Sequence, residues 1–278
     1  MKLAAPPVKE AALALGLDVY QPVRVRDGEL QRWLEARRPD VALVVAYGRI
    51  LPPPVLGAPT RGCLNLHASV LPEYRGAAPI QWAIAEGRTE TGISLMQMDA
   101  GMDTGPVFAV RRLPITPETS GGELTRALAE LAAAMVGEEF LAAAAGELVA
   151  VPQDDARASS APPITKEHLA IDWARSGADI VNQVRAFSPA PGAFTFSGER
   201  RLKVLEARLG AGSSSAPPGV ILGTHGAALE VACGGGSVQI WRAGAEGKSP
   251  QSGRDLVNGR WLEVGGHLGS AASPPAET

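Results

Sequence analysis

The sequence predicts an α/β fold class, with a doubly wound, mostly parallel sheet followed by a small OB-like β-barrel. In the first half of the chain, apolar runs of strand length alternate with helical patterns, which is typical of a sheet covered by helices. In the last third, short alternating segments are separated by Gly and Pro, which is typical of a small barrel. The 278 residues are enough for two such domains.

Composition is globular and gives little sign of a partner. Hydrophobic residues make up 45% of the chain, and the net charge of −3 does not indicate nucleic acid. Two distant cysteines, Cys63 and Cys233, form no disulfide framework and fit a reducing cytosol, so we expect a cytoplasmic location. No signal peptide and no apolar stretch of membrane-spanning length is visible, so no membrane partner is expected.

The first elements follow the apolar periodicity and the residues that interrupt it. A helix over 8–15 ends at Gly16, and a short strand follows at about 19–21. A charged amphipathic helix over 29–37 stops before Pro39. This opening lacks the strong hydrophobic strand and Gly-containing turn with which a doubly wound domain usually begins.

Four strands and two helices are expected next. The first expected strand, over 41–46, is a continuous apolar run, which is typical of a strand covered on both faces. Pro79 suits the first turn of a helix, and Gly146 ends an Ala-rich one. The expected strands are 41–46, 63–68, 91–98 and 105–112, the last of which is expected to hairpin back. The expected helices are 78–86 and 124–145.

The later segments are shorter and end in a polar tail. We expect a short strand over 171–173, a helix over 178–187 and a closing helix over 253–259. The barrel strands are expected at 193–196, 202–207, 219–222, 228–232 and 237–241. The predicted organisation is a first domain over 1–146, a linker over 147–163, a barrel domain over 164–264 and a disordered tail over 265–278.

Two polar side chains stand near the end of strand 63–68. Residues two apart on a strand point to the same side, so Asn65 and His67 share one face. The strand runs directly into a Pro-closed turn, Ser69 to Pro72. Because ligands of open α/β sheets bind at the carboxyl ends of strands, we expect a binding site here.

Asp103 lies in the exit loop of the next expected strand and completes a set suited to carbonyl chemistry. Asn and His can donate to a developing oxyanion, and a carboxylate can move a proton. The chain offers no nucleophile of its own, because Cys63 lies roughly 13 Å from His67 along the strand and Ser69 lacks the Gly-x-Ser-x-Gly turn. The nucleophile is therefore expected to come from a substrate. No metal is expected, because His67 has no second histidine at ligand spacing.

The segment from Asn65 to Asp103 resembles the 10-formyltetrahydrofolate-dependent formyltransferase family. The shared pattern is Asn-x-His, then Ser-x-Leu-Pro, then an Arg-Gly turn, and Asp-x-Gly at an interval that Asp103 matches from His67. Within the family, Arg75-Gly-Ala-Ala-Pro-Ile-Gln81 and the run 96–105 look most like the methionyl-tRNA branch. The likeness covers most of the chain.

The resemblance implies a Rossmann-like formyltransferase domain that is catalytic and a C-terminal barrel that helps to hold tRNA. The implied reaction is transfer of a formyl group from 10-formyltetrahydrofolate, as co-substrate, to the α-amino group of methionyl-tRNA for translation initiation. The implied partners are this initiator tRNA and the folate donor, and the expected state is a monomer. The implied catalytic residues are Asn65, His67 and Asp103, and the implied pterin-pocket residues are Ser69, Val70, Leu71 and Pro72.

Several interpretations stay open at this point. The resemblance puts Met1 roughly forty residues inside the usual start, so a first strand and its turn are expected to be missing. A misassigned start explains this better than a truly shortened protein. The alternatives are a catalytically impaired fragment that only binds folate or tRNA, and a transferase or hydrolase that uses another acceptor. Arg75 either reaches an anion or caps its loop, and Arg200, Arg201 and Lys203 either meet tRNA phosphates or are solvated surface.

Overall fold

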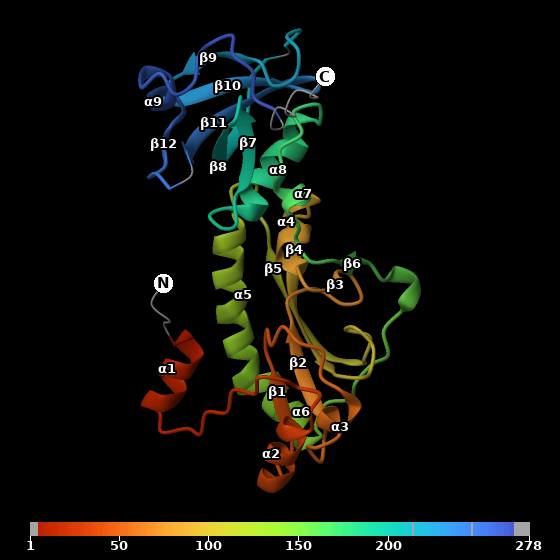
Figure 1. Ribbon diagram of the computed structural model, residues 1–278. Coiled ribbons are helices and arrows are strands. Elements are labelled where there is room, and N and C mark those ends of the chain that lie inside the picture. The colour runs from red at the N-terminus through yellow and green to blue at the C-terminus, as the bar shows by residue number, and fades with distance from the viewer. Residues whose placement is uncertain (1–4, 213, 246, 270–278) are drawn as a thin grey trace, which may run out of the picture.

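The computed structural model describes residues 5–212, 214–245 and 247–269. An α/β unit lies at one end of an elongated molecule and a β-barrel at the other (Figure 1). The buried core runs through both, since it includes Leu95 of the first unit and Ile240 of the barrel in one cluster. No helix among the described residues has the length and apolar character needed to cross a membrane.

A four-stranded sheet forms the centre of the first unit. Its order is β1 (Ala42–Val44), β2 (Cys63–His67), β4 (Glu90–Gln97) and β5 (Val107–Pro114). β1 and β2 are parallel, whereas β2–β4 and β4–β5 are antiparallel. The α/β class is confirmed, and so is the hairpin expected at strand 105–112. The mostly parallel pairing is wrong for this sheet, because β2 and β4 are antiparallel as well. The short loop between β4 and β5 can join only antiparallel strands.

The N-terminal region departs from expectation at two points. Helices α1 (Pro7–Ala14) and α2 (Glu29–Arg37) form, but the strand expected at 19–21 does not. The Tyr20 ring stacks on Trp33 of α2 with centroids 5.2 Å apart, so this segment packs on a helix instead of pairing. β1 is half-buried rather than covered on both faces. A four-residue helix, α3 (Pro53–Leu56), follows β1.

Helices α4 (Pro79–Ala85) and α5 (Gly121–Met135) cover the sheet. Ser120 caps α5 in a reciprocal pair with Glu123: the Ser120 hydroxyl accepts from the Glu123 N–H, and the Glu123 carboxylate accepts from the Ser120 N–H. The chain continues through a π-helical turn (Val136–Phe140) and α6 (Leu141–Ala145) to Gly146, which ends the helix in the left-handed conformation. The long helical segment expected over 124–145 is thus present, with a π turn inside it.

The second unit is an antiparallel sheet preceded by α7 (Lys166–Leu169) and α8 (Gly177–Phe187). The strand order is β7-β8-β11-β10-β9, with β12 paired to β11, and α9 (Gly253–Asn258) follows. The strand expected at 171–173 is reduced to a single bridge between Ala170 and Phe194, because the chain turns where the Arg175 N–H donates to the Asp172 carbonyl. Trp173 is buried there, and its ring N–H donates to Thr195. The strand bounds are β7 (Ala193–Ser197), β8 (Arg200–Leu209), β9 (Ile221–His225), β10 (Ala228–Cys233), β11 (Gly236–Ala245) and β12 (Gln251–Ser252).

Residues 265–269 connect the two edges of this sheet. Gly269 and Phe196 of β7 exchange main-chain hydrogen bonds at 2.9 and 3.0 Å. Leu268 donates to Gly219, and Gly265 donates to Ile221, beside the other edge. The expected disorder from residue 265 is therefore wrong for 265–269, since these amides replace a missing strand neighbour. The rest of the expected tail, 270–278, lies outside the described residues.

The segment 147–163, expected as a linker, follows the surface of the first unit before it reaches the barrel (Figure 1). It contains a 3-10 turn (Asp155–Arg157) and the short strand β6 (Ser160–Ala161). β6 pairs in parallel with β3 (Arg75–Gly76), directly after the turn that follows β2. The segment therefore touches the region where the functional site was expected. The domain boundaries at 146, 163 and 264 stay predictions.

Candidate active site

β2 carries two of the predicted site residues toward the edge of the sheet. In the register, Asn65 lies opposite Val44 of β1 and Met96 of β4, and His67 lies opposite Ser94. Asn65 and His67 alternate along β2 and so share one face, as expected. Asn65 is half-buried, and within the described chain its side chain makes no hydrogen bond. Its amide N–H groups are therefore available to a ligand.

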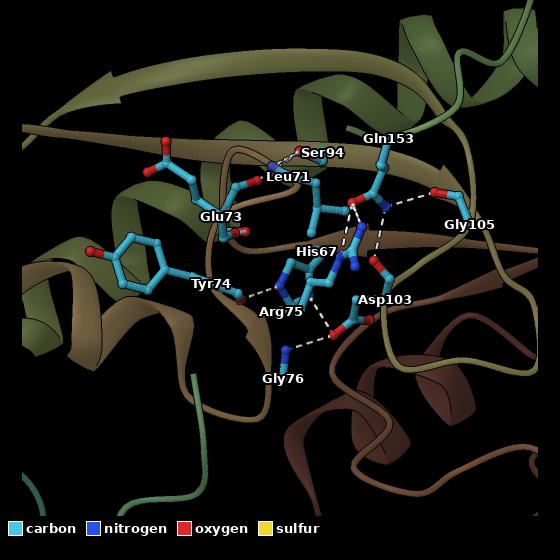
Figure 2. A network of polar contacts seen from close by, with 11 residues as sticks. His67, Leu71, Glu73, Tyr74, Arg75, Gly76, Ser94, Asp103, Gly105 and Gln153 are labelled. Carbon is cyan, nitrogen blue, oxygen red and sulfur yellow. Dashed lines mark hydrogen bonds and ion pairs between the residues drawn. The ribbon is translucent and has the colours of Figure 1, made fainter. Parts of the chain in front are cut away.

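His67 is almost fully buried, with 6% of its surface exposed, and both ring nitrogens face protein oxygens. Nε2 lies 2.9 Å from the Tyr74 carbonyl oxygen, and Nδ1 lies 3.6 Å from Asp103 Oδ2 (Figure 2). A carbonyl oxygen only accepts, so with the ring in this orientation Nε2 carries the hydrogen. The Asp103 carboxylate lies on the other side of the ring, next to Nδ1, where its negative charge can polarise the imidazole.

Asp103 reaches the site from the loop after β4. Its backbone has φ of +55°, a left-handed conformation that is uncommon outside glycine. Its carboxylate accepts from the Gly76 N–H at 2.9 Å as well as facing His67. Asp99 does not reach His67, because it caps its own loop by accepting from Gly101 N–H and Thr104 Oγ1. The structure therefore brings together His67 and Asp103.

The predicted pterin-pocket turn is anchored from inside. Ser69 Oγ donates to the Glu73 carbonyl at 2.6 Å, and Ser94 Oγ both donates to the Ser69 carbonyl and accepts from the Leu71 N–H. The side chains of Ser69, Leu71 and Pro72 are buried, and only Val70 is half-exposed. A ligand at this turn would therefore meet Val70 and the main chain, while the other three side chains fix the shape of the turn.

Tyr74 connects this turn to α4. It adopts φ of +60°, and its N–H donates to Ser159 Oγ at 2.9 Å. Its hydroxyl donates to Glu86 at 2.5 Å and accepts from Arg88 at 2.7 Å. Burial, reinforced by the Glu86 hydrogen bond, raises the pKa of Tyr74 to about 12, so the hydroxyl stays protonated at neutral pH. These side-chain contacts hold Tyr74 in place, and with it the main-chain carbonyl that accepts from His67 Nε2.

Arg75 caps its loop rather than presenting a free cation. Its guanidinium donates to Gln153 Oε1 and to Asp155 Oδ1, and its side chain is 14% exposed. Of the two interpretations left open for Arg75, the structure favours the cap. Asp155 is 82% exposed, so this ion pair is screened by water on one side.

Sequence reasoning missed Tyr74, Gln153 and Ser159. All three are brought to the site by tertiary contacts: Ser159 lies 85 positions from Tyr74, and Gln153 lies 50 positions from Asp103. No local period or motif spacing carries that information. The one available signal was the polar composition of the segment 147–163, which also fits an ordinary linker.

Neither cysteine is suited to act as a nucleophile. Cys63 is buried, its Sγ faces the main-chain oxygens of Val55 and Leu56 at 3.9 and 3.8 Å, and burial raises the pKa of the thiol. Burial likewise raises the pKa of Cys233. In the described ranges no group of three His, Cys, Asp or Glu side chains is arranged to hold a metal ion.

The barrel carries basic side chains around a cavity of about 370 Å³. The cavity lining includes Arg201, Lys203 and Lys248. Arg201 also stacks over the Phe194 ring at 4.0 Å, and Arg200 stacks over Trp261 at 4.7 Å. Lys203 and Arg201 thus face a space that an anion could enter, whereas Arg200 is held against the barrel.

Two family models match the chain. The model described as formyl transferase matches residues 2–138, and the model described as formyl transferase, C-terminal domain, matches residues 163–260. A methionyl-tRNA formyltransferase from Sorangium cellulosum is 52% identical over 271 residues, covering 97% of this chain and 87% of the relative. One from a Synechococcus strain is 47% identical, covering 95% of this chain and 84% of the relative.

Solved structures share the fold at lower identity. HypX from Aquifex aeolicus, crystallised with tetrahydrofolic acid, aligns with a TM-score of 0.65 at 20% identity, covering 91% of this chain and 44% of that one. Methionyl-tRNA formyltransferase from Clostridium thermocellum aligns with a TM-score of 0.54 at 21% identity, covering 68% of this chain and 80% of that one. With both family models and these close relatives in agreement, the chain belongs to the methionyl-tRNA formyltransferase family.

Proposed function

We propose that this chain transfers a formyl group from 10-formyltetrahydrofolate to the α-amino group of methionyl-tRNA, the initiator tRNA of translation. The observation that carries the proposal is the contact between His67 and Asp103, with Asn65 on the same strand face as His67. A buried imidazole with a carboxylate beside it, and amide donors on the same strand face, suits acyl transfer to an amine.

In this mechanism Asn65 donates to the oxygen of the formyl group as it becomes an oxyanion. His67 adds a second donor through its Nε2–H, which in the structure is held by the Tyr74 carbonyl. An oxyanion is a stronger acceptor than a neutral carbonyl, so it can compete for this hydrogen.

Asp103 handles the proton. A free α-amino group has a pKa of about 7.7–8.0, so a neutral amine is available near pH 7. The amine nitrogen bonds to the formyl carbon, and the bond from that carbon to N10 of the folate breaks. Asp103, polarising His67, passes the proton from the amine toward the leaving nitrogen.

The surrounding surfaces fit the two substrates. We place the pterin at the turn formed by Ser69, Val70, Leu71 and Pro72, where Val70 and the main chain can touch it. The basic cavity on the barrel can take a tRNA phosphate next to Lys203. We further propose that the protein acts in the cytoplasm as a monomer.

The test is a formyl-transfer assay of the purified chain with 10-formyltetrahydrofolate and methionyl-tRNA, alongside free amino sugars and ribonucleotide amines as acceptors. Formate release is measured without any acceptor. We expect transfer to methionyl-tRNA, and a fall of about 10²–10³ in kcat for Asn65→Ala with the fold retained. Formylation of another acceptor alone, formate release alone, or unchanged kcat in Asn65→Ala would contradict the proposal.

A further inference from the structure

We propose that Gln153, in the segment between the two domains, is a positioning residue that holds the Asp103 loop in its reactive geometry. The inference rests on the proposed function and adds a residue outside its catalytic motif. Gln153 is half-buried, and its side chain lies between Arg75 and the Asp103 loop (Figure 2). It therefore joins three segments that are distant in the sequence.

The Gln153 amide uses all of its strong hydrogen-bonding groups at this site. Nε2 donates to the main-chain oxygens of Asp103 at 2.8 Å and Gly105 at 2.7 Å. Oε1 accepts from Nε and Nη2 of Arg75 at 3.1 and 2.8 Å. A side-chain amide has two N–H hydrogens and one oxygen with two lone pairs, so each group has a partner.

These four contacts also fix which way the amide faces. If the oxygen and nitrogen were exchanged, the oxygen would face two carbonyl oxygens and the NH₂ group would face a guanidinium. Both contacts would be repulsive. The network therefore allows one orientation, in which the amide nitrogen of Gln153 donates to the Asp103 loop and the amide oxygen accepts from Arg75.

The Asp103 loop needs such a grip because its conformation is unfavourable by itself. A non-glycine residue at φ of +55° persists only where its surroundings over-determine the backbone. Gln153 binds the carbonyl of that residue and the carbonyl two residues later. With the loop held, the Asp103 carboxylate can meet the Gly76 N–H and His67 Nδ1.

Gln153→Glu separates the two halves of this contact. The variant keeps the length of the side chain and two oxygens for Arg75, but it places an oxygen against the carbonyls of Asp103 and Gly105. Displacing a reactive group by about 1 Å can cost on the order of a hundredfold in rate. We expect kcat to fall between about tenfold and a hundredfold, with KM for both substrates within about twofold of wild type.

Asp155→Asn is the matched control. It changes the other, exposed partner of the same Arg75 and leaves the Gln153 contacts intact. Its kcat should stay within about twofold of wild type, since exposed ion pairs contribute little. A loss in Asp155→Asn equal to that in Gln153→Glu would mean that Arg75, not the Asp103 loop, is what matters, and would overturn the inference.

Amide exchange of Gly76 gives a readout that does not depend on activity. The Gly76 N–H donates to Asp103, so we expect its exchange to accelerate in Gln153→Glu while the exchange of β10 and β11 in the barrel is unchanged. If wild type fails to formylate methionyl-tRNA, the proposed function is wrong, and this exchange measurement still decides the positioning.

A second variant covers the case in which Gln153→Glu does not fold. Gln153→Met is neutral, similar in length and without N–H donors, and the same fall in kcat with accelerated Gly76 exchange is expected. Wild-type kcat in a folded Gln153→Glu or Gln153→Met protein, or Gly76 exchange equal to that of wild type, would overturn the inference.

Discussion

The segments 5–28 and 147–163 each contain only short helices or strands, but they differ in how firmly they are held against the rest of the protein. α1, in the first segment, buries no residue, and Val8 and Leu15 are 81% and 74% exposed. In the second segment Ala161 is fully buried and β6 pairs with β3. The second segment is also tied to the site through Gln153 and Ser159.

Composition alone therefore does not distinguish a loosely held segment, such as 5–28, from one that supports the site, such as 147–163. Both segments contain polar residues and proline, and both have exposed apolar side chains, such as Val149 at 84% in the second. What distinguishes them is hydrogen bonding. Val151 pairs with Val107, and Ser159 accepts from the Tyr74 N–H, so the connecting segment is fixed by main-chain partners in addition to the burial of Ala161.

The largest effect is expected from Gly76→Ala, which attacks the pairing of β3 with β6. Gly76 has φ of +124°, and an added Cβ would lie 2.7 Å from the Ala161 carbonyl oxygen. Because the obstacle is main chain, β3 and β6 must move apart, and a shift of β3 draws the Gly76 N–H away from the Asp103 carboxylate. We expect a loss of roughly 1–3 kcal/mol in unfolding free energy, and a fall in kcat of tenfold or more.

Gly198→Ala is the control for that experiment. Gly198 also has positive φ, +60°, but an added Cβ would meet nothing within 4 Å. Denaturant unfolding should show a loss of about 1–2 kcal/mol from the backbone conformation alone, and kcat should be unchanged. If the two alanine variants lose kcat equally, the pairing of the connecting segment does not support the site.

The smallest effect is expected from Leu15→Ser at the end of α1. Leu15 is 74% exposed, so exchanging it for a polar residue removes little packing. The unfolding free energy should change by less than about 0.5 kcal/mol, and kcat should not change. A loss above about 1 kcal/mol in chemical denaturation would show that the N-terminal segment is held as firmly as the connecting one.

Local pattern predicted most of the elements of the fold, and with motif spacing it named Asn65, His67 and Asp103, whose catalytic roles stay predictions. Alternation along residues 63–68 placed Asn65 and His67 on one face, and motif spacing selected Asp103 over Asp99. The errors came where tertiary contacts decide. Tyr20 stacks on a helix, so 19–21 forms no strand. Residues 265–269 bond to two sheet edges despite a sequence typical of a disordered tail.

Residues that support the site were beyond such reasoning for the same physical reason. Tyr74 stood next to a recognised motif, but its importance comes from its main-chain carbonyl, which any residue could supply in sequence terms. Gln153 and Ser159 act across long chain separations. Their contacts with the site form only because the connecting segment folds back over the first unit, and local sequence patterns do not predict that course of the chain.

Residue-resolved hydrogen–deuterium exchange of the intact protein tests the central claim that the connecting segment is part of the active site. We predict that the amides of Val151 and Arg75, which donate to Val107 and Ser159, are protected to the same degree as those of β2 and β4. The amides of α1 should exchange near the intrinsic rate, because an eight-residue helix without buried contacts is marginal. Exchange of Val151 and Arg75 as fast as that of α1 would contradict the account.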